Sequence, residues 1–334
     1  MRSIAGRLGR LRVLVPLATA VAVVVVLPFV VSGYHTYQLA QVAIYFVAVM
    51  GLNVVTGYAG QISLGHGAFM LIGAYTTSAL IVHAGAPYGW TIPIAGIVAG
   101  IAGFLFGFPA LRLAGVYLAL ATLAIATALP GLAEHFASLT GGSIGTRLPA
   151  PRAPLGWRVS GNVWIYVLSW AVAGAMLALS WLILRGRFGR ALRAIRDRHA
   201  AAVASGVNLA LYKTLAFGVS ALFAGVSGSL LVLSLGYINP SVFPITLSIL
   251  LLTGAVVGGL GTLAGPIFGG VLIVYLWVTP FYATLSHVPK DSPPVIYGLL
   301  TIAVMFLVPH GVVGALRRLV AAARGRTRAR LTTA

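Results

Sequence analysis

Long apolar runs, each about as long as a bilayer is thick, constrain this chain more than any other feature. A membrane-spanning helix needs about 20 mostly apolar residues, and 60% of the 334 residues are hydrophobic while only 7% are charged. A soluble protein of this length needs a larger charged surface. The sequence therefore predicts an all-α, polytopic membrane protein with one transmembrane domain over residues 1–334. The hydropathy pattern predicts ten spans, near 13–31, 37–56, 61–83, 91–109, 114–133, 163–184, 213–236, 242–259, 263–281 and 294–310.

Basic residues gather at the ends of the apolar runs, where the positive-inside rule puts them. The net charge of +19 therefore indicates topology rather than nucleic-acid binding. With ten spans and a cytoplasmic N-terminus, 18 of the 22 Lys and Arg residues fall inside and 4 outside. We predict a protein of the cell (inner) membrane with both termini cytoplasmic, a Gly/Pro-rich outer loop at 134–162 and a basic tail at 317–334 near lipid headgroups.

The basic start and the apolar run at 13–31 also admit a cleaved signal peptide. The run is long for a signal sequence and no clear small-residue cleavage site follows it. These features favour an uncleaved first span.

Two Gly-rich stretches interrupt the apolar pattern, one in each half of the chain. They are TGYAGQISLGHGAF at 56–69 and GGLGTLAGPIFGG at 258–270. Paired breaks of this kind mark the substrate path in transporters built from two related halves, and glycine lets backbone approach a ligand. The alternative is close helix packing through small residues, which the GxxxG spacings within 96–107 and 254–269 favour. The predicted path residues are Asn53, Gly57, Tyr58, Gly60, Gln61, Ser63, Gly65, His66 and Gly67.

The chain lacks the residues that would power transport by itself. Its only carboxylates, Glu134, Asp197 and Asp291, lie at span edges or in a loop, which disfavours a proton relay through the membrane. No GxxxxGK[ST] phosphate loop is present. We predict no catalytic residue, cofactor or metal on this chain, and ATP with Mg²⁺ on separate partner subunits.

A basic insert at 185–213 separates two apolar runs and holds seven of the 22 basic residues. Its apolar positions recur at helical spacing, which predicts a short amphipathic helix from Arg190 that stops at Gly206. Arg193 and Asp197 stand at i,i+4 spacing and are predicted to pair. Such a helix could dock in a groove on an ATPase. Alternatively, the insert is a solvated basic loop that lies on anionic lipid; both interpretations stay open. Its apolar face would hold Leu192, Ile195, His199, Ala202 and Val203.

Three ordered stretches resemble the branched-chain amino acid ABC-transporter permeases, specifically the M-type (LivM-like) subunit. They are GLNVVTGYAGQISLGHGAFMLIGAYT at 51–76, GRALRAIRDRHAAAVASGVNLALYKTLAFGVSALFAGVSGSL at 189–230, and GYINP with GAVVGGLGTLAGPIFGG within 236–270. The resemblance covers almost the whole chain. It departs at His199 and Val203, where the family often has Glu, and at Ile144, where a polar residue is common.

The resemblance implies a type II-like importer permease. Its partners would be a second permease subunit (LivH-type), two cytoplasmic ATP-binding subunits and an extracytoplasmic solute-binding protein. The residues implied to couple to the ATPase are Gly189, Arg190, Arg193, Arg196, Asp197, Gly206 and Lys213.

We therefore expect a permease subunit that imports branched-chain or related hydrophobic amino acids and is not itself an enzyme. The alternatives are a permease for urea or short amides, a self-sufficient secondary transporter or channel, and a membrane scaffold.

Overall fold

The computed structural model describes residues 26–28, 31–110, 113, 115–151, 153, 159–275, 298–299, 302–303, 306, 311–316 and 318. The predicted first span at 13–31, the last at 294–310 and the end of the ninth at 263–281 fall largely outside these residues. The predicted tail at 317–334 does so as well.

The described chain is almost entirely helical, with one short two-stranded sheet. Six of its helical segments are long and apolar enough to cross a membrane. They begin at Gly33, Tyr88, Val116, Gly161, Leu209 and Pro240. The elements are α2 (Gly33–Leu52), η1 (Asn53–Tyr58), α3 (His66–Val82), α4 (Tyr88–Ala110), α5 (Val116–His135), α6 (Ala137–Thr140), η2 (Gly142–Ile144), β1 (Thr146–Arg147), α7 (Gly161–Arg185), α8 (Arg187–Asp197), α9 (His199–Ala204), α10 (Leu209–Leu235), β2 (Tyr237–Ile238), η4 (Pro240–Val242), α11 (Ile245–Gly258) and α12 (Gly265–Ile273).

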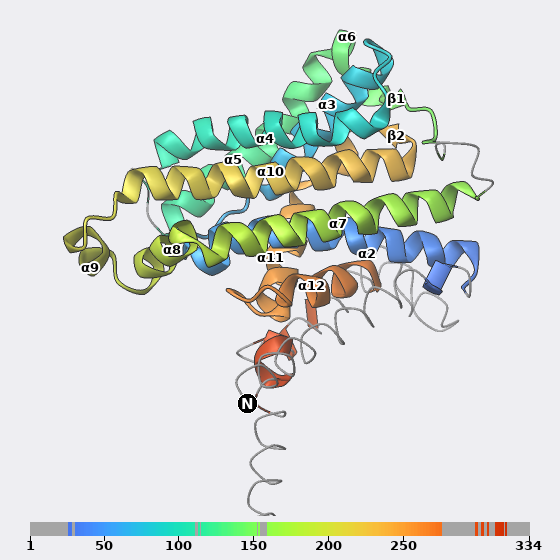
Figure 1. Cartoon of the computed structure of the whole chain (residues 1–334). Coiled ribbons are helices and arrows are strands. Elements are labelled where there is room, and N and C mark those ends of the chain that lie inside the picture. Colours follow the sequence, from blue (N-terminus) through green and yellow to red (C-terminus); the bar gives the residue numbers. More distant parts are fainter. Residues whose placement is uncertain are drawn as a thin grey trace, which may run out of the picture.

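Helices α2 and α10 form the centre of the bundle. Both are mostly buried, whereas α5 and α7 are mostly exposed along their lengths. Helix α10 packs on α4, α3 and α2, and α2 packs on α7 and α12. Figure 1 shows α4, α10 and α7 running side by side. The peripheral helices thus lie around the two central ones and turn their outer faces away from the core.

Small residues let the central helices approach closely. An added Cβ at Gly73 of α3 would collide with the backbone of Gly225 on α10, and one at Gly228 of α10 with the backbone of Met70. The glycines of the 96–107 stretch on α4 likewise face α10. Packing through small residues is the general solution for helices in lipid, and the preference for packing at these glycines is confirmed.

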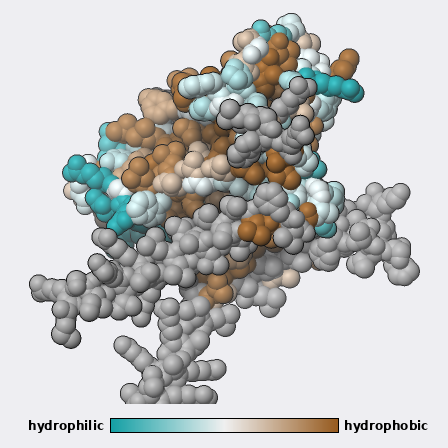
Figure 2. All heavy atoms as spheres, turned by 45° about the vertical axis from the view of Figure 1, so that its right-hand side comes forward, coloured by the Kyte–Doolittle hydropathy of each residue, from teal (hydrophilic) through white to brown (hydrophobic). Residues whose placement is uncertain are grey.

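The two ends of the bundle carry different elements. Helices α8 and α9 lie at one end, and α6, β1 and β2 lie at the other (Figure 1). Strand β1 pairs antiparallel with β2, Thr146 opposite Ile238 and Arg147 opposite Tyr237. The predicted outer loop is therefore held to the segment that follows α10. Figure 2 shows a broad hydrophobic surface between hydrophilic groups at the two ends, as a multi-pass membrane protein requires.

The predicted span 61–83 is wrong at its start. Residues 59–65 are not helical, and α3 begins only at His66. Gly60 has φ +68°, a conformation that ends a helix and that side-chain-bearing residues rarely adopt. The middle of the first Gly-rich stretch, residues 59–65, therefore forms a non-helical break between η1 and α3.

Candidate functional site

The two Gly-rich stretches, about 200 residues apart in sequence, meet at one side chain. Asn53, 2% exposed, begins η1. Its Nδ2 donates to the carbonyl oxygen of Thr262 at 2.7 Å, and its Oδ1 accepts from the Gly261 amide at 2.8 Å. These two hydrogen bonds connect the break after α2 to the turn between α11 and α12. The amide of Asn53 thus satisfies polar backbone that could not stay unpaired in a buried setting.

Arg196 of α8 reaches the same junction from outside the bundle. Its Nη1 donates to the carbonyl oxygen of Gly57 at 2.6 Å. An added Cβ at Gly60 would stand 2.7 Å from Arg196 Cγ, and one at Gly261 would stand 2.8 Å from Nη1. The arginine therefore occupies the space that side chains at these glycines would fill.

The basic insert folds as two helices rather than the single one predicted. The break is at Arg198, whose φ of −154° and ψ of 104° are extended. The α9 helix ends at Ala204, and Gly206 follows with φ +79°, so the predicted stop at Gly206 is confirmed. An extended residue between two short helices changes the direction of the chain, which a continuous 3.6-residue pattern does not reveal.

The apolar side of α8 faces the helical bundle itself. Leu192 and Ile195 are fully buried, and Leu192 joins a cluster with Val54, Val55 and Phe217. Of the apolar face predicted for the insert, Ala202 is also buried, but His199 and Val203 are exposed. A groove on a partner would therefore meet the arginine side of α8 instead of the aliphatic side.

The predicted Arg193–Asp197 pair is wrong. Within the described part of the chain, the ion pair in this insert joins Arg196 Nε to Asp197 Oδ1 at 3.3 Å. Arg196 is drawn inward by Gly57, which brings its Nε beside the next residue, while Arg193 stays exposed.

The remaining residues implied to couple lie around this helix. Gly189 packs where an added Cβ would collide with the backbone of Leu184 at the end of α7. Arg190 is exposed, and Lys213, partly buried, lies in the first turns of α10.

The start of α3 is held by hydroxyl groups from three other helices. Thr122 of α5 accepts from the Leu64 amide at 2.9 Å, and Ser248 of α11 accepts from the Gly67 amide at 2.9 Å. Ser220 Oγ of α10 lies 3.5 Å from His66 Nδ1, and His66 is only 1% exposed. Five of the nine predicted path residues thus form two groups: Asn53, Gly57 and Gly60 at the Asn53 junction, and His66 and Gly67 at the α3 start.

The residues between the two groups continue the break. Ser63 and Gln61 are buried, and the backbone N–H of Gln61 donates to the carbonyl oxygen of Val55 at 3.0 Å. Tyr58 is buried in the cluster that also receives Leu192, and Gly65 stands against Thr122, where an added Cβ would meet its carbonyl oxygen at 3.0 Å. Together these residues offer amide, hydroxyl and imidazole groups and no charge, which suits an uncharged or zwitterionic solute. Whether they line a path stays a prediction.

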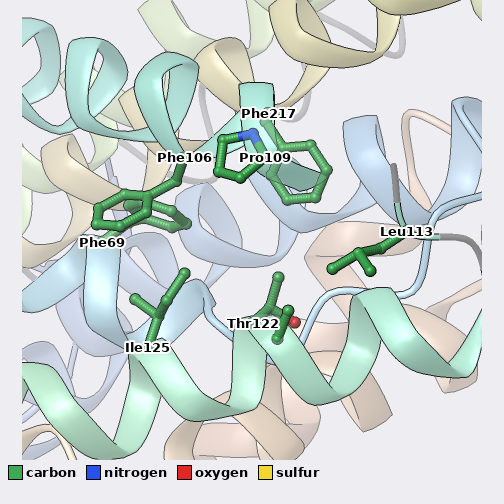
Figure 3. Close-up of a pocket in the computed structure, with 8 residues that line it drawn as sticks. Phe69, Phe106, Pro109, Leu113, Thr122, Ile125 and Phe217 are labelled. Atoms are coloured by element: carbon green, nitrogen blue, oxygen red, sulfur yellow. The ribbon is translucent and has the colours of Figure 1, made fainter. Parts of the chain in front are cut away.

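A small apolar cavity adjoins the second group. Its volume is about 70 Å³. Figure 3 shows Phe106, Pro109 and Phe217 on one side of it and Thr122 with Ile125 of α5 on the other. Because Thr122 also accepts a hydrogen bond from the Leu64 amide, the same residue lines the cavity and contacts the break. The lining residues are Phe69, Phe106, Pro109, Leu113, Ala121, Thr122, Ile125 and Phe217.

Sequence reasoning missed the hydroxyl residues that fix the break. Thr122, Ser220 and Ser248 lie within apolar runs that also hold other Ser and Thr residues, among them Thr127, Ser227 and Thr246. A hydroxyl in a span has to find a hydrogen-bond partner. A carbonyl of its own helix can supply one, so this signal does not separate the three residues from their neighbours.

Comparison with known proteins places the chain among transport permeases. Residues 34–309 match the family model described as branched-chain amino acid transport system / permease component. The high-affinity branched-chain amino acid transport system permease protein LivM of Salmonella typhimurium is 32% identical over 281 residues, covering 77% of this chain and 66% of that protein. LivM of Escherichia coli is 33% identical over 270 residues, covering 74% of this chain and 64% of that protein.

A second kind of relative is matched nearly end to end. The permease protein LivH of Escherichia coli is 30% identical over 285 residues, covering 81% of this chain and 91% of that protein. The chain thus spans just under two thirds of the two LivM proteins and most of LivH. No solved structure matches the chain.

Proposed function

The chain belongs to the permease component family of branched-chain amino acid transport systems, and from this premise we propose that it is the membrane-spanning subunit of an ATP-driven importer. Its cargo is branched-chain or related hydrophobic amino acids. It carries no catalytic role, and ATP with Mg²⁺ binds to partner subunits. Both termini and the α8–α9 insert lie on the cytoplasmic side, as the distribution of basic residues supports.

The observation that carries the proposal is the orientation of α8. Its aliphatic side is buried against η1 while Arg187, Arg190 and Arg193 face outward. When a cytoplasmic partner displaces a helix that is packed against the membrane bundle in this way, the displacement is transmitted to η1, on which the helix packs. A loop that lay on lipid would instead turn its aliphatic side outward.

The exposed side of α8 also describes the partner. Arg187, Arg190 and Arg193 are exposed along one helix. A surface of one sign calls for the opposite sign across an interface. The ATP-binding subunit should therefore offer acidic side chains to α8.

The proposed assembly contains a second permease subunit and an extracytoplasmic solute-binding protein. The relatives include both LivM and LivH, each named a permease protein of a high-affinity branched-chain amino acid transport system. Two kinds of permease chain with such names support a pair. The mostly exposed apolar faces of α5 and α7 leave room for the second subunit as well as for lipid.

The apolar cavity and the uncharged break support the cargo class. A hydrophobic amino acid has an aliphatic side chain that suits the cavity and a zwitterionic backbone that suits amide and hydroxyl groups. Thr122 belongs to both features, because it lines the cavity and also accepts a hydrogen bond from the Leu64 amide of the break.

Uptake into proteoliposomes tests the proposal. The chain is purified with the second permease, ATP-binding and solute-binding subunits of its own organism, and uptake of radiolabelled leucine is measured with and without ATP. We expect uptake only with ATP and all four kinds of subunit. Leucine uptake by the chain alone under a sodium or proton gradient would show a secondary transporter instead, and ATP-driven uptake of urea but not leucine would correct the cargo.

A further inference from the structure

One arginine connects the outer helix to both breaks in the bundle. Arg196 is the α8 arginine whose side chain reaches η1, and its Nη1 donates to the Gly57 carbonyl at 2.6 Å. We propose that Arg196 is a positioning residue that locks α8 to the Gly57 end of η1 and, through Asn53, to the Gly261–Thr262 turn. The inference rests on the proposed function and deepens it by naming the residue through which movement of α8 reaches the membrane helices.

The chemistry of the contact is that of a helix cap supplied from another element. The last carbonyl groups of a helix have no partner within it, and the C-terminal end carries partial negative charge. Gly57 is in the last turn of η1. The Arg196 guanidinium therefore satisfies an unpaired carbonyl and places a positive charge where the helix end favours one.

Packing makes the contact specific for arginine. The Arg196 stem lies over Gly60 and its head beside Gly261. These glycines have φ of +68° and +72°, so a side chain at either would be strained as well as crowded. The Nε of Arg196 meanwhile pairs with Asp197 at 3.3 Å. A lysine carries its donors on a single nitrogen and lacks the rigid fork by which Nε and Nη1 reach Asp197 and Gly57 at the same time.

Asn53 extends the connection from one break to the other. Its Oδ1 lies over Gly57, where no Cβ could fit, and accepts from the Gly261 amide. The turn between α11 and α12 is therefore tied to the residue that Arg196 holds. A displacement of α8 would move Gly57 and Gly261 together, which would couple the two Gly-rich breaks.

Hydrogen exchange tests the connection in the purified chain, independently of transport. In Arg196→Gln, the amides of 53–61 should exchange about tenfold faster, the size expected for loss of one hydrogen bond to a charged group. Arg196→Lys should fall between that variant and the wild type. Arg193→Gln removes a charge from the same helix without losing a hydrogen bond in the described structure, and 53–61 should then exchange as in the wild type.

Coupling in the assembled complex tests the role. The ratio of ATP hydrolysed to leucine imported should rise several-fold in Arg196→Gln while the complex still assembles, and Arg147→Gln, at the β1 end of the bundle, should keep the wild-type ratio. An unchanged ratio in Arg196→Gln, or unchanged exchange of 53–61, would overturn the inference. Absence of ATP-dependent uptake by the wild-type complex would instead contradict the proposed function, and the exchange measurement would still decide whether the cap exists.

Discussion

Asn53 Nδ2 lies 2.7 Å from the carbonyl oxygen of Thr262, 209 positions along the chain. This hydrogen bond, with its counterpart to Gly261, is what makes two separate interruptions of the membrane helices into one junction.

Replacing Asn53 with Ala should destabilise the protein. The change removes the side-chain partner of the Gly261 amide and of the Thr262 carbonyl, both partly buried, and each lost hydrogen bond costs about 0.5–1.5 kcal/mol. Thermal unfolding in detergent micelles should show the loss. Asn162→Ala is the matched control, because Asn162 also donates to a backbone carbonyl, that of Gly33 at 3.1 Å, but is exposed. Equal effects of the two substitutions would contradict a special role for the buried amide.

Thr122→Val should loosen the break before α3 while keeping the shape of the side chain. It removes the acceptor of the Leu64 amide, which costs roughly 1–3 kcal/mol if the amide stays buried. Exchange of the 59–66 amides should become faster, and leucine uptake should fall. Thr127→Val on the same helix should change neither, because Thr127 bonds only to carbonyls of its own helix. Normal exchange of 59–66 in Thr122→Val would count against this anchor.

Gly228→Ala should disrupt the contact between α3 and α10. The added methyl group would collide with the backbone of Met70, and backbone cannot move aside as a flexible side chain can. Overpacking of this kind costs about 1–3 kcal/mol. Gly174→Ala, on α7 with nothing within 4 Å of the added carbon, should be neutral or mildly stabilising. Unfolding midpoints of the two variants give the comparison, and a stable Gly228→Ala would mean that the helices are farther apart.

Arg190→Glu should weaken binding of the ATP-binding subunit. An exposed ion pair contributes up to about 1 kcal/mol, so reversal of the charge should lower the affinity roughly tenfold at low salt. The effect should shrink as salt is added, because screening shortens the range of exposed charges. Arg147→Glu, at the β1 end of the bundle, should leave that affinity unchanged. An affinity for Arg190→Glu that matches the wild type would point to a different docking face.

Much of the helix pattern could be predicted because it depends on neighbouring residues. The runs at 91–109, 163–184 and 213–236 were each placed within a few residues of α4, α7 and α10. The start of α3 was not, because the positive φ of Gly60 ends the helical path, and the sequence alone does not show how far the non-helical segment after it extends.

The site could be predicted only in part, for the same reason. The glycines at 57–67 stood out because they interrupt an apolar run. The arginines of the insert stood out because charged residues collect outside the membrane spans. The amphipathic pattern of α8 indicated that its apolar side would be buried, and a groove on a partner ATPase was one predicted binding surface for it. The structure covers it with η1 and the end of α7, because these were the nearest apolar surfaces once the bundle formed.

The sequence by itself determined that this chain crosses a membrane, where its helices run and at which end its positive charge collects. Those properties follow from the thickness of the bilayer and from the cost of placing charge in it, and both act on each segment separately. Only the tertiary structure decided that Asn53 meets Gly261 and that Arg196 reaches Gly57. Contacts between residues so far apart in the chain depend on how whole helices pack against one another, and no local pattern records that.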